Sequence, residues 1–402
     1  MATYYVAKAG NDSNNGSTRA LAKLTIQNAL DSATSADDIV EIVDEGTYNE
    51  GNIQIKANSV TIQHTASTLG RPKIHGTGLA SNPGTRAFYN DYIGPILKGL
   101  EVYGYSGVVM QKGAQAKGME IEDCFFHSVP KFNSNTLVGT SADPNIIKQS
   151  TMFFNGSSFT GPLNDGYLEI ENCLITSSAT TGDWPLLYDY STRGTASFCT
   201  VINRGDTSKS TMRMSKVINC FVSTSQGMGI ASDDQTFNIV CATGGGFAFR
   251  NYADGAAAAT GTGEQQIDHD EVGFVDGSAI GITAAIAANY NLTQNSTAFN
   301  AGTAYNDIFV DITGNLRPQK GYDIGCFELT VPWSDYGFQK TGNTNNGFVI
   351  QNYNNLSGNF LFRANSPEPH NPEQVPFSLG VKGPPTLRRF RAVGQKPYKV
   401  TK

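Results

Sequence analysis

The sequence is short of the features that mark most enzymes with a metal or a cofactor. No pair among its five histidines has the spacing of zinc ligands, and only 16% of the 402 residues are charged. None of the six cysteines belongs to a CxxC pair, so we expect buried free thiols rather than zinc or redox chemistry. P-loop, dinucleotide-binding and G-x-S-x-G motifs are missing as well. We therefore expect no metal and no cofactor.

Segments for export or membrane insertion are missing too. The start, MATYYVAKAGNDSNNGS, has neither the basic nor the apolar region of a signal peptide. No apolar run is long enough to span a bilayer. We expect neither a secretion signal nor a transmembrane segment.

What the sequence has in quantity is glycine, with 43 residues, together with many Asn, Thr and Ser. This composition is typical of many short strands separated by turns. One amphipathic helix is predicted at about residues 20–34, where Leu21, Leu24, Ile26 and Leu30 have roughly helical spacing. After it, short apolar strands begin at residue 39.

A weak internal repeat indicates how these strands are arranged. MEIEDCFF (119–126), LEIENCLI (168–175) and SKVINCFV (215–222) share an Asp-Cys or Asn-Cys pair between apolar residues, and Cys199, Cys220 and Cys241 are evenly spaced. A period of about 20 to 25 residues with short strands predicts a solenoid, in which each coil buries its face against its neighbours. In a parallel β-helix such pairs would stack from coil to coil.

Two segments resemble a known group. YYVAKAGNDSNNGS with DIVEIVDEGTYNEGNIQI near the start, and DITGNLRPQKGYDIGCFEL (311–329), are similar to the pectate-lyase-like superfamily of right-handed parallel β-helix proteins. The resemblance implies an all-β, single-stranded right-handed parallel β-helix over about residues 3–329. It further implies an N-terminal capping helix and a last coil added by DIGCFEL. The fold carries lyases, hydrolases, adhesins and phage spikes alike, so it leaves the function open.

Changes in composition divide the chain into three predicted parts. Residues 1–329 form the β-helix domain, and residues 330–366, rich in aromatic side chains, form a small β appendage. Residues 367–402 are rich in proline and basic, which favours an extended C-terminal arm.

Carboxylates are the side chains with which β-helix enzymes act on polysaccharides. Asp233 and Asp234 are the best acidic pair, although neighbours in one strand point to opposite faces and a solvated turn explains them as well. Asp268, in QIDHDEVGFVDG, belongs to an acidic cluster that would be either a cation site or a charged loop. Arg71-Pro72 and Arg317-Pro318 are weak echoes of a lyase-like Arg-Pro element.

The C-terminal arm points to a partner. From residue 381 onward there are seven basic residues and no acid; without those seven, 22 basic residues stand against 35 acidic ones, a formal charge of −13. We expect the arm to bind an acidic surface by charge, with aromatic anchors. The residues predicted to bind are Arg388, Arg389, Phe390, Arg391, Lys396, Tyr398, Lys399 and Lys402.

These features favour a structural protein of a bacteriophage particle, either a capsid decoration protein or a spike or fibre subunit in the virion. The partners would be other virion proteins, and a homotrimer is expected from the resemblance and from the prevalence of closed symmetry. The alternative is a polysaccharide lyase or glycoside hydrolase, including a depolymerising tailspike that binds a surface glycan. Nucleic acid is a less suitable partner, because the acidic body would repel it.

Overall fold

A computed structural model places the chain in two compact units, Met1–Leu329 and Thr330–Lys402. The structure describes residues 1–65, 70–79, 83–113, 116–133, 137–138, 140, 142–155, 163–177, 186–189, 194–203, 210–224, 228–232, 234–242, 249–250, 265–266, 292–293, 296–305, 310–315, 317, 322–329, 338–339, 349–350, 359–363 and 376–380. Each unit is described by itself below.

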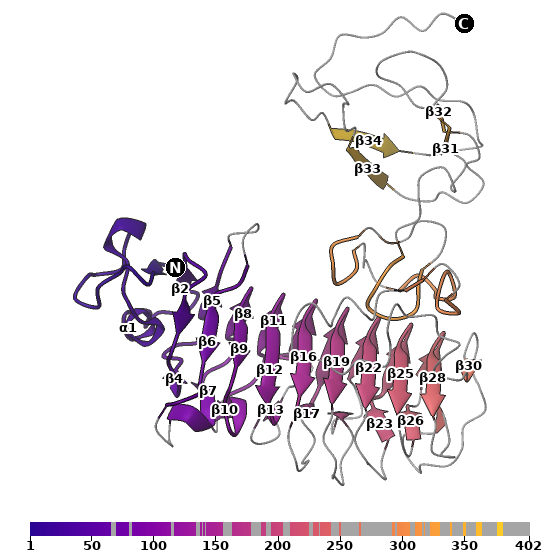
Figure 1. Cartoon of the computed structure of the whole chain (residues 1–402), viewed down its shortest axis with the longest axis horizontal. Helices are drawn as coiled ribbons and strands as arrows, with labels where there is room; N and C mark the ends of the chain where they lie inside the picture. The colour runs from indigo at the N-terminus through magenta and orange to yellow at the C-terminus, as the bar shows by residue number, and fades with distance from the viewer. Residues whose placement is uncertain are drawn as a thin grey trace, which may run out of the picture. The chain divides into compact units, whose positions relative to one another are not determined.

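The first unit is a parallel β-solenoid, as predicted, and its strands lie side by side in chain order (Figure 1). Sheet A consists of β1 (Thr3–Val6), β2 (Ile39–Ile42), β5 (Thr61–Gln63), β8 (Ile96–Lys98), β11 (Glu120–Glu122), β15 (Asn145–Lys148), β18 (Leu168–Glu171), β21 (Thr195–Ser197), β24 (Lys216–Ile218) and β27 (Asp234–Thr236). Sheet B consists of β3 (Thr47–Tyr48), β6 (Lys73–His75), β9 (Glu101–Tyr103), β12 (Phe125–Val129), β16 (Thr151–Phe154), β19 (Leu174–Ser177), β22 (Thr200–Asn203), β25 (Phe221–Thr224), β28 (Ile239–Ala242) and β30 (Gln265–Gln266).

Two shorter parallel sheets form the third face of the coils. Sheet C consists of β4 (Ile53–Gln54), β7 (Arg86–Asn90), β10 (Val108–Lys112) and β13 (Lys131–Asn133). Sheet D consists of β14 (Leu137–Val138), β17 (Leu163–Gly166), β20 (Leu187–Asp189), β23 (Ser210–Arg213), β26 (Met228–Ala231) and β29 (Phe249–Arg250). Where the side chains of the strands are described, inward-pointing residues from all four sheets form one apolar core.

The helix α1 spans Ile26–Ser32, which is shorter than predicted. Thr25 keeps an extended backbone and its side chain accepts from Asn28 N, so the helix begins after it. Residues Arg19–Leu21 form a separate 3-10 turn, η1, and a second one, η2, spans Pro83–Thr85. Ile26, Ala29 and Leu30 are buried in the core, and the helix contacts β1 and β2, the first two strands of sheet A, and β4, the first strand of sheet C. Within the described residues, no helix has the length and apolar character needed to cross a membrane.

The repeated Asp-Cys and Asn-Cys pairs form the corner between sheets A and B, in the register that the sequence predicted. Asp123, Asn172 and Asn219 have positive φ angles of 51°, 55° and 52°, a conformation that Asn and Asp tolerate better than most residues. The cysteine that follows each of them is buried in the core. Cys241 was wrongly aligned with this row, because it pairs with Ser223 and Asn238 holds the corner position.

The C-terminal segment 292–329 does not add a last coil, contrary to the prediction. Its residues Leu292, Ala298, Ile324, Cys326 and Phe327 pack on the outer face of sheet B. In Figure 1 this segment, in orange, lies beside the later strands of the solenoid. The physical reason is that the outward positions of those strands are apolar and need a cover; they are Phe153, Leu174, Ile202, Phe221 and Ile239.

The second unit contains antiparallel strand pairs. β31 (Phe338–Gln339) pairs with β32 (Val349–Ile350), and β33 (Asn359–Arg363) pairs with β34 (Pro376–Gly380). The second pair joins residues on either side of the boundary predicted at 366/367. Proline is tolerated there because it is the first residue of a strand in a two-stranded sheet.

Candidate functional site

The outer face of sheet B carries a row of ring side chains on three consecutive coils. In β6, β9 and β12 the second residues Ile74, Val102 and Phe126 point inward and are fully buried. The residue after each of them therefore points outward. Those residues are His75, Tyr103 and His127, and they are direct partners in the parallel register. We call them the ring row.

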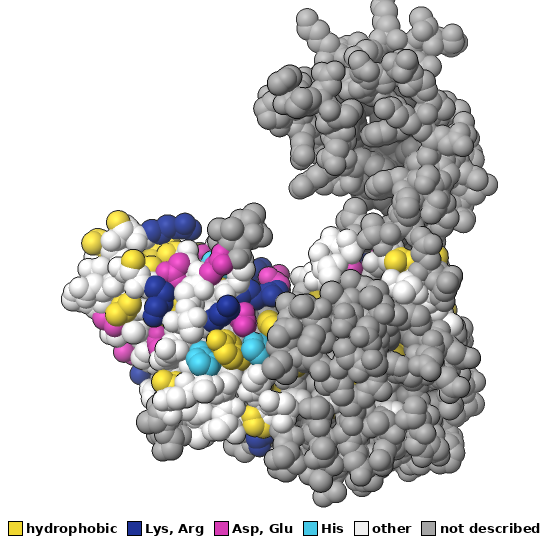
Figure 2. Space-filling model, in the orientation of Figure 1, with side chains coloured by type: hydrophobic (Ala, Val, Ile, Leu, Met, Phe, Trp, Pro, Cys, Tyr) yellow, Lys and Arg dark blue, Asp and Glu magenta, His cyan; other side chains and the backbone are white. Residues whose placement is uncertain are grey.

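The rings of this row stack on one another. The centroids of His75 and Tyr103 are 4.4 Å apart with an interplanar angle of 25°, and those of Tyr103 and His127 are 4.6 Å apart at 11°. Figure 2 shows two histidine side chains on this face of the molecule with hydrophobic side chains between them. Because the ring faces contact each other, a ligand on this surface would meet mainly the ring edges, which carry the imidazole nitrogens and the Tyr103 hydroxyl.

Polar partners hold two of the rings in place. Nε2 of His127 lies 3.1 Å from Oε1 of Glu101, and Nδ1 of His127 lies 3.2 Å from Oγ of Ser128. Nδ1 of His75 lies 3.3 Å from Oδ1 of Asn49. The His127 and Glu101 side chains are 11% and 20% exposed, so they are shielded from water but still reachable.

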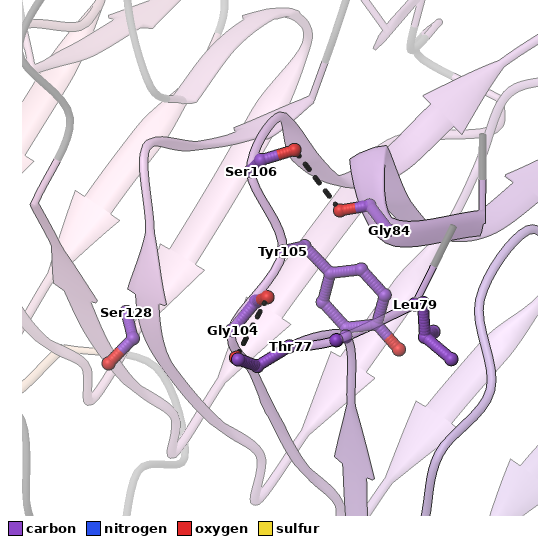
Figure 3. Close-up of a pocket in the computed structure, with 9 residues that line it drawn as sticks. Thr77, Leu79, Gly84, Gly104, Tyr105, Ser106 and Ser128 are labelled. Atoms are coloured by element: carbon purple, nitrogen blue, oxygen red, sulfur yellow. Dashed lines mark hydrogen bonds between the residues drawn. The ribbon is translucent and has the colours of Figure 1, made fainter. Parts of the chain in front are cut away.

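A pocket of about 420 Å³ adjoins the ring row. It is lined by the residue that directly follows each ring, which is Gly76, Gly104 or Ser128. The rest of the lining consists of Thr77, Gly78, Leu79, Gly84, Tyr105 and Ser106. In Figure 3 the Tyr105 ring lies between Leu79 and Ser128, and two hydrogen bonds cross the pocket wall, from Thr77 to the Gly104 carbonyl and from Ser106 to the Gly84 carbonyl. The lining residues that the structure describes carry no charged side chain, so the pocket suits a neutral polar ligand.

The same outer face is closed farther along the solenoid. Phe153 continues the ring row after His127 but is only 1% exposed, and segment 292–329 covers the strands that follow. Among the described residues, the open part of sheet B is therefore the part around β6, β9 and the His127 side of β12, since Phe125 of β12 already belongs to the covered cluster.

Of the three predicted catalytic carboxylates, only one lies in the described part of the chain. Asp234 is half exposed in β27, and its carboxylate lies 3.1 Å from Nζ of Lys216 on the outer face of sheet A. Asp233 and Asp268 lie outside the described residues, as does most of the acidic cluster around Asp268. Asp234 is not brought near the ring row, which is on sheet B.

The two Arg-Pro arginines have structural partners. Arg71 is paired with Asp123 at the corner of the next coil but one, through both the carboxylate and the carbonyl of Asp123. Arg317 is buried in segment 292–329 with its guanidinium 2.9 Å from the Glu328 carboxylate, which leaves it out of reach of a substrate.

The predicted partner-binding residues of the arm lie outside the described residues; they are Arg388, Arg389, Phe390, Arg391, Lys396, Tyr398, Lys399 and Lys402. Among the residues that the structure does describe, no group of three or more His, Cys, Asp or Glu could hold a metal ion.

The ring row was missed in the sequence because its members are 24 and 28 residues apart and share no motif. One signal could have found them. Each follows a buried residue that is flanked by two outward ones, as in Lys73-Ile74-His75 and Glu101-Val102-Tyr103. Aligning these strands by the corner positions would have placed the rings in one row.

Comparisons with known proteins bear on the fold. No protein-family model and no curated protein matches the sequence. Among solved structures, pectate lyase Pel9A matches with a TM-score of 0.50 and 15% identity, over 82% of this chain and 97% of that chain. A rhamnogalacturonan lyase matches with a TM-score of 0.39 and 14% identity, over 61% and 70% of the two chains. The pectin methylesterase from Aspergillus niger matches with a TM-score of 0.39 and 12% identity, over 67% and 84%.

At identities this low the likeness concerns the fold alone. It agrees with the sheet order, in which parallel strands of successive coils stack on three faces. The first unit is a parallel β-helix of the pectate-lyase type.

Proposed function

We propose that the β-helix binds a polysaccharide on the open part of sheet B. The observation that carries the proposal is the ring row beside an uncharged pocket, repeated on three successive coils. A linear glycan also repeats its hydroxyl groups along one direction. A surface that offers one ring edge per coil can therefore hydrogen-bond a series of sugar units.

The chemistry of the lining favours a neutral glycan. Tyr103, His75 and His127 offer donors and acceptors, and Thr77 and Ser106 add hydroxyl groups, all of which match sugar hydroxyls. The nearby carboxylate of Glu101 would repel a polyuronate chain. We therefore place a protein that acts on or binds polysaccharide, the alternative in the sequence analysis, ahead of a purely structural role in a virion. The β-helix fold shared with a pectate lyase is consistent with this order.

Tyr103→Ala tests the proposal, since Tyr103 stacks on both histidines. We expect it to weaken glycan binding at least tenfold, which corresponds to about 1.4 kcal/mol. Binding is measured by affinity electrophoresis and calorimetry against a panel of neutral and acidic polysaccharides. Tyr89→Ala is the matched control, because Tyr89 is a partly exposed tyrosine on the outer face of sheet C, beside Arg86. Equal losses in the two variants, or no binding to any glycan in the panel, would refute the proposal.

We propose as a second candidate that the C-terminal arm attaches the protein to a phage particle as a decoration, spike or fibre subunit. The support is its charge: seven basic residues and no acidic one from residue 381 onward, behind an acidic body. The two roles are compatible, because a tailspike is both a virion part and a glycan-binding protein.

Removal of residues 367–402 is the test of attachment. We expect the shortened protein to keep its folded β-helix and lose binding to acidic virion proteins, measured by co-sedimentation with particles. Raised salt should weaken attachment of the full chain, because the contacts are ionic. Normal co-sedimentation of the shortened protein would contradict this role.

A further inference from the structure

Ser128, His127 and Glu101 form a continuous hydrogen-bonded chain at the edge of the pocket. Oγ of Ser128 lies 3.2 Å from Nδ1 of His127, and Nε2 of the same imidazole lies 3.1 Å from Oε1 of Glu101. A hydroxyl, an imidazole and a carboxylate in this order are the parts of an activated serine nucleophile.

The carboxylate fixes the direction of the chain. An ionised carboxylate only accepts hydrogen bonds, so the proton of a neutral His127 must lie on Nε2, where it is donated to Glu101. Nδ1 is then left as an acceptor, and the Ser128 hydroxyl donates to it. This is the protonation state in which an imidazole can take the serine proton as a general base.

The backbone at Ser128 supports a role beyond packing. Its φ is 54°, and β12 changes register with β16 between His127 and Val129, so Ser128 occupies a bulge at the end of the strand. On the preceding coil the corresponding corner is Gly104, with φ 76°, and Gly104 N donates to the Ser128 carbonyl. A serine in place of glycine costs about 1–2 kcal/mol in this conformation. The serine with this unfavourable backbone conformation lines the pocket, which is where a functional side chain would offset its cost in stability.

The side chain of Ser128 lies on the rim of the pocket rather than on its floor. Figure 3 shows its hydroxyl turned away from the Tyr105 ring, on the side opposite Leu79. An acyl group carried as a substituent on a glycan that follows the ring row would reach this hydroxyl without entering the pocket completely.

We propose that Ser128 is the nucleophile of an acyl-transfer site that removes ester-linked acyl groups, such as acetyl, from the bound glycan. The inference rests on the proposed glycan binding for its natural substrate, but the chemistry belongs to this chain of three side chains. Ser128 and His127 would be catalytic residues, and Glu101 a positioning residue that acts through His127.

The reaction proceeds in two balanced halves. Oγ of Ser128 attacks the ester carbonyl carbon while its proton passes to Nδ1 of His127; the bond to the sugar oxygen then breaks, and that oxygen leaves with the proton from Nδ1. Water next attacks the acyl-serine ester, again giving a proton to Nδ1. The carboxylic acid is released when the Ser128 oxygen takes that proton back. Glu101 stabilises the imidazolium formed in each half, because its carboxylate lies 3.1 Å from Nε2 of His127.

The test uses the full chain and two probes, p-nitrophenyl acetate and acetylated xylan. We expect release of p-nitrophenol and acetate, and an adduct of a fluorophosphonate reagent located on Ser128 by peptide mass spectrometry. Ser128→Gly should lower both hydrolysis rates at least a hundredfold. Glycine suits the positive φ, so this variant should keep the wild-type fold, checked by circular dichroism and thermal melting.

Ser59→Gly is the matched control. Ser59 also has a positive φ, 53°, but it lies at the corner that leads into sheet A, and Ile93 O is bonded to its amide. It should leave hydrolysis and labelling unchanged. In Glu101→Gln the imidazolium loses its carboxylate partner, so kcat for p-nitrophenyl acetate should fall at least tenfold while KM stays unchanged. A purely structural role of Glu101 would change KM and the melting temperature together with kcat.

The outcomes separate this inference from glycan binding. If Ser128→Gly still binds the glycan panel but the wild type releases no acetate and carries no fluorophosphonate on Ser128, the acyl-transfer site is refuted and glycan binding stands. If p-nitrophenyl acetate is hydrolysed at Ser128 but no glycan binds, the site stands and its proposed substrate is wrong. Hydrolysis that persists in Ser128→Gly also refutes the site.

Discussion

Arg317 holds segment 292–329 on the β-helix, and removing its charge is the sharpest test of how that segment is attached. Its guanidinium lies 2.9 Å from Oε2 of Glu328, 3.1 Å from the Asp323 carbonyl and 2.9 Å from the Gly325 carbonyl. It also reaches Oδ1 of Asn172, 3.3 Å away at the corner between sheets A and B, and stacks on the Phe198 ring at 4.6 Å. Arg317→Met keeps most of the volume and removes the charge and all of these hydrogen bonds.

The expected magnitude follows from the burial of the pair. The Arg317 and Glu328 side chains are 0% and 2% exposed. Removing one partner of a buried ion pair costs about 3–5 kcal/mol, because the other charge is left uncompensated. Burial, together with the Asp323 charge, raises the pKa of Glu328 to about 8, and burial raises that of Asp323 to about 6. Above pH 8 Glu328 is ionised, so Arg317→Met is expected to lose the full stability of about 3–5 kcal/mol. Near pH 5 both carboxyl groups are protonated, and the variant is expected to lose only about 1–3 kcal/mol, which is what unsatisfied polar groups cost.

Hydrogen exchange followed by mass spectrometry measures this effect locally. The free energy of opening is compared for peptides from residues 296–305 and 322–329 and for a peptide across β2 in sheet A. Lys56→Met is the control, because Lys56 lies 3.7 Å from Asp31 in an exposed pair that contributes about 0–1 kcal/mol. A loss below 1 kcal/mol for Arg317→Met at pH 8.5, or an equal loss at pH 5 and pH 8.5, would show that the ionic cluster does not hold the segment.

Three further outcomes are expected. In the wild type, the raised pKa of Glu328 means that the folded state binds more protons than the unfolded state. The contribution of this group to the free energy of unfolding, measured in urea, should therefore be largest below about pH 4.5 and should be lost as the pH rises through about 8. Gly104→Ala should destabilise the fold by about 2–4 kcal/mol in urea titrations, since φ is 76° and the added Cβ would lie 2.5 Å from Oγ1 of Thr77. Five cysteine thiols are buried, and burial raises the pKa of the Cys124 thiol to about 12; the five are Cys124, Cys173, Cys199, Cys220 and Cys326. None of them should react with Ellman's reagent before the protein unfolds. Fast reaction of any of the five in the native protein would contradict their placement.

The fold could be predicted because its signals are local and repeated. Asp123-Cys124, Asn172-Cys173 and Asn219-Cys220 mark the same corner on different coils, where a positive φ is followed by a small apolar residue that points inward. The repeat also explains why Cys241 was aligned with the wrong position, since the alignment assumed coils of equal length. Coil length varies from as much as 35 residues between Ile62 and Leu97 to 18 between Cys220 and Asn238, so an even spacing of cysteines is no guide to register.

The candidate site could not be predicted, since its geometry depends on which residues of different coils become neighbours. His75, Tyr103 and His127 are ordinary residues in the sequence, and the parallel register alone brings their rings within 4.6 Å of each other. Asp233 and Asp234 were predicted as an acidic pair because they are adjacent in the sequence. Glu101 and His127 are 26 residues apart and become partners only across β9 and β12.

The place of segment 292–329 on the outside of the solenoid connects the fold to the site. Sheet B presents outward apolar side chains from Phe125 in β12 onward, among them Phe153, Leu174 and Ile202, which water would penalise if they were exposed. Because the segment covers those strands instead of lengthening the solenoid, the first coils keep their outer face open. The outward residues change in character within β12, where Phe125 belongs to the covered apolar cluster and His127 to the ring row that continues through Tyr103 and His75. That change along one sheet explains why a ligand would bind at β6, β9 and β12 and not farther along the same face.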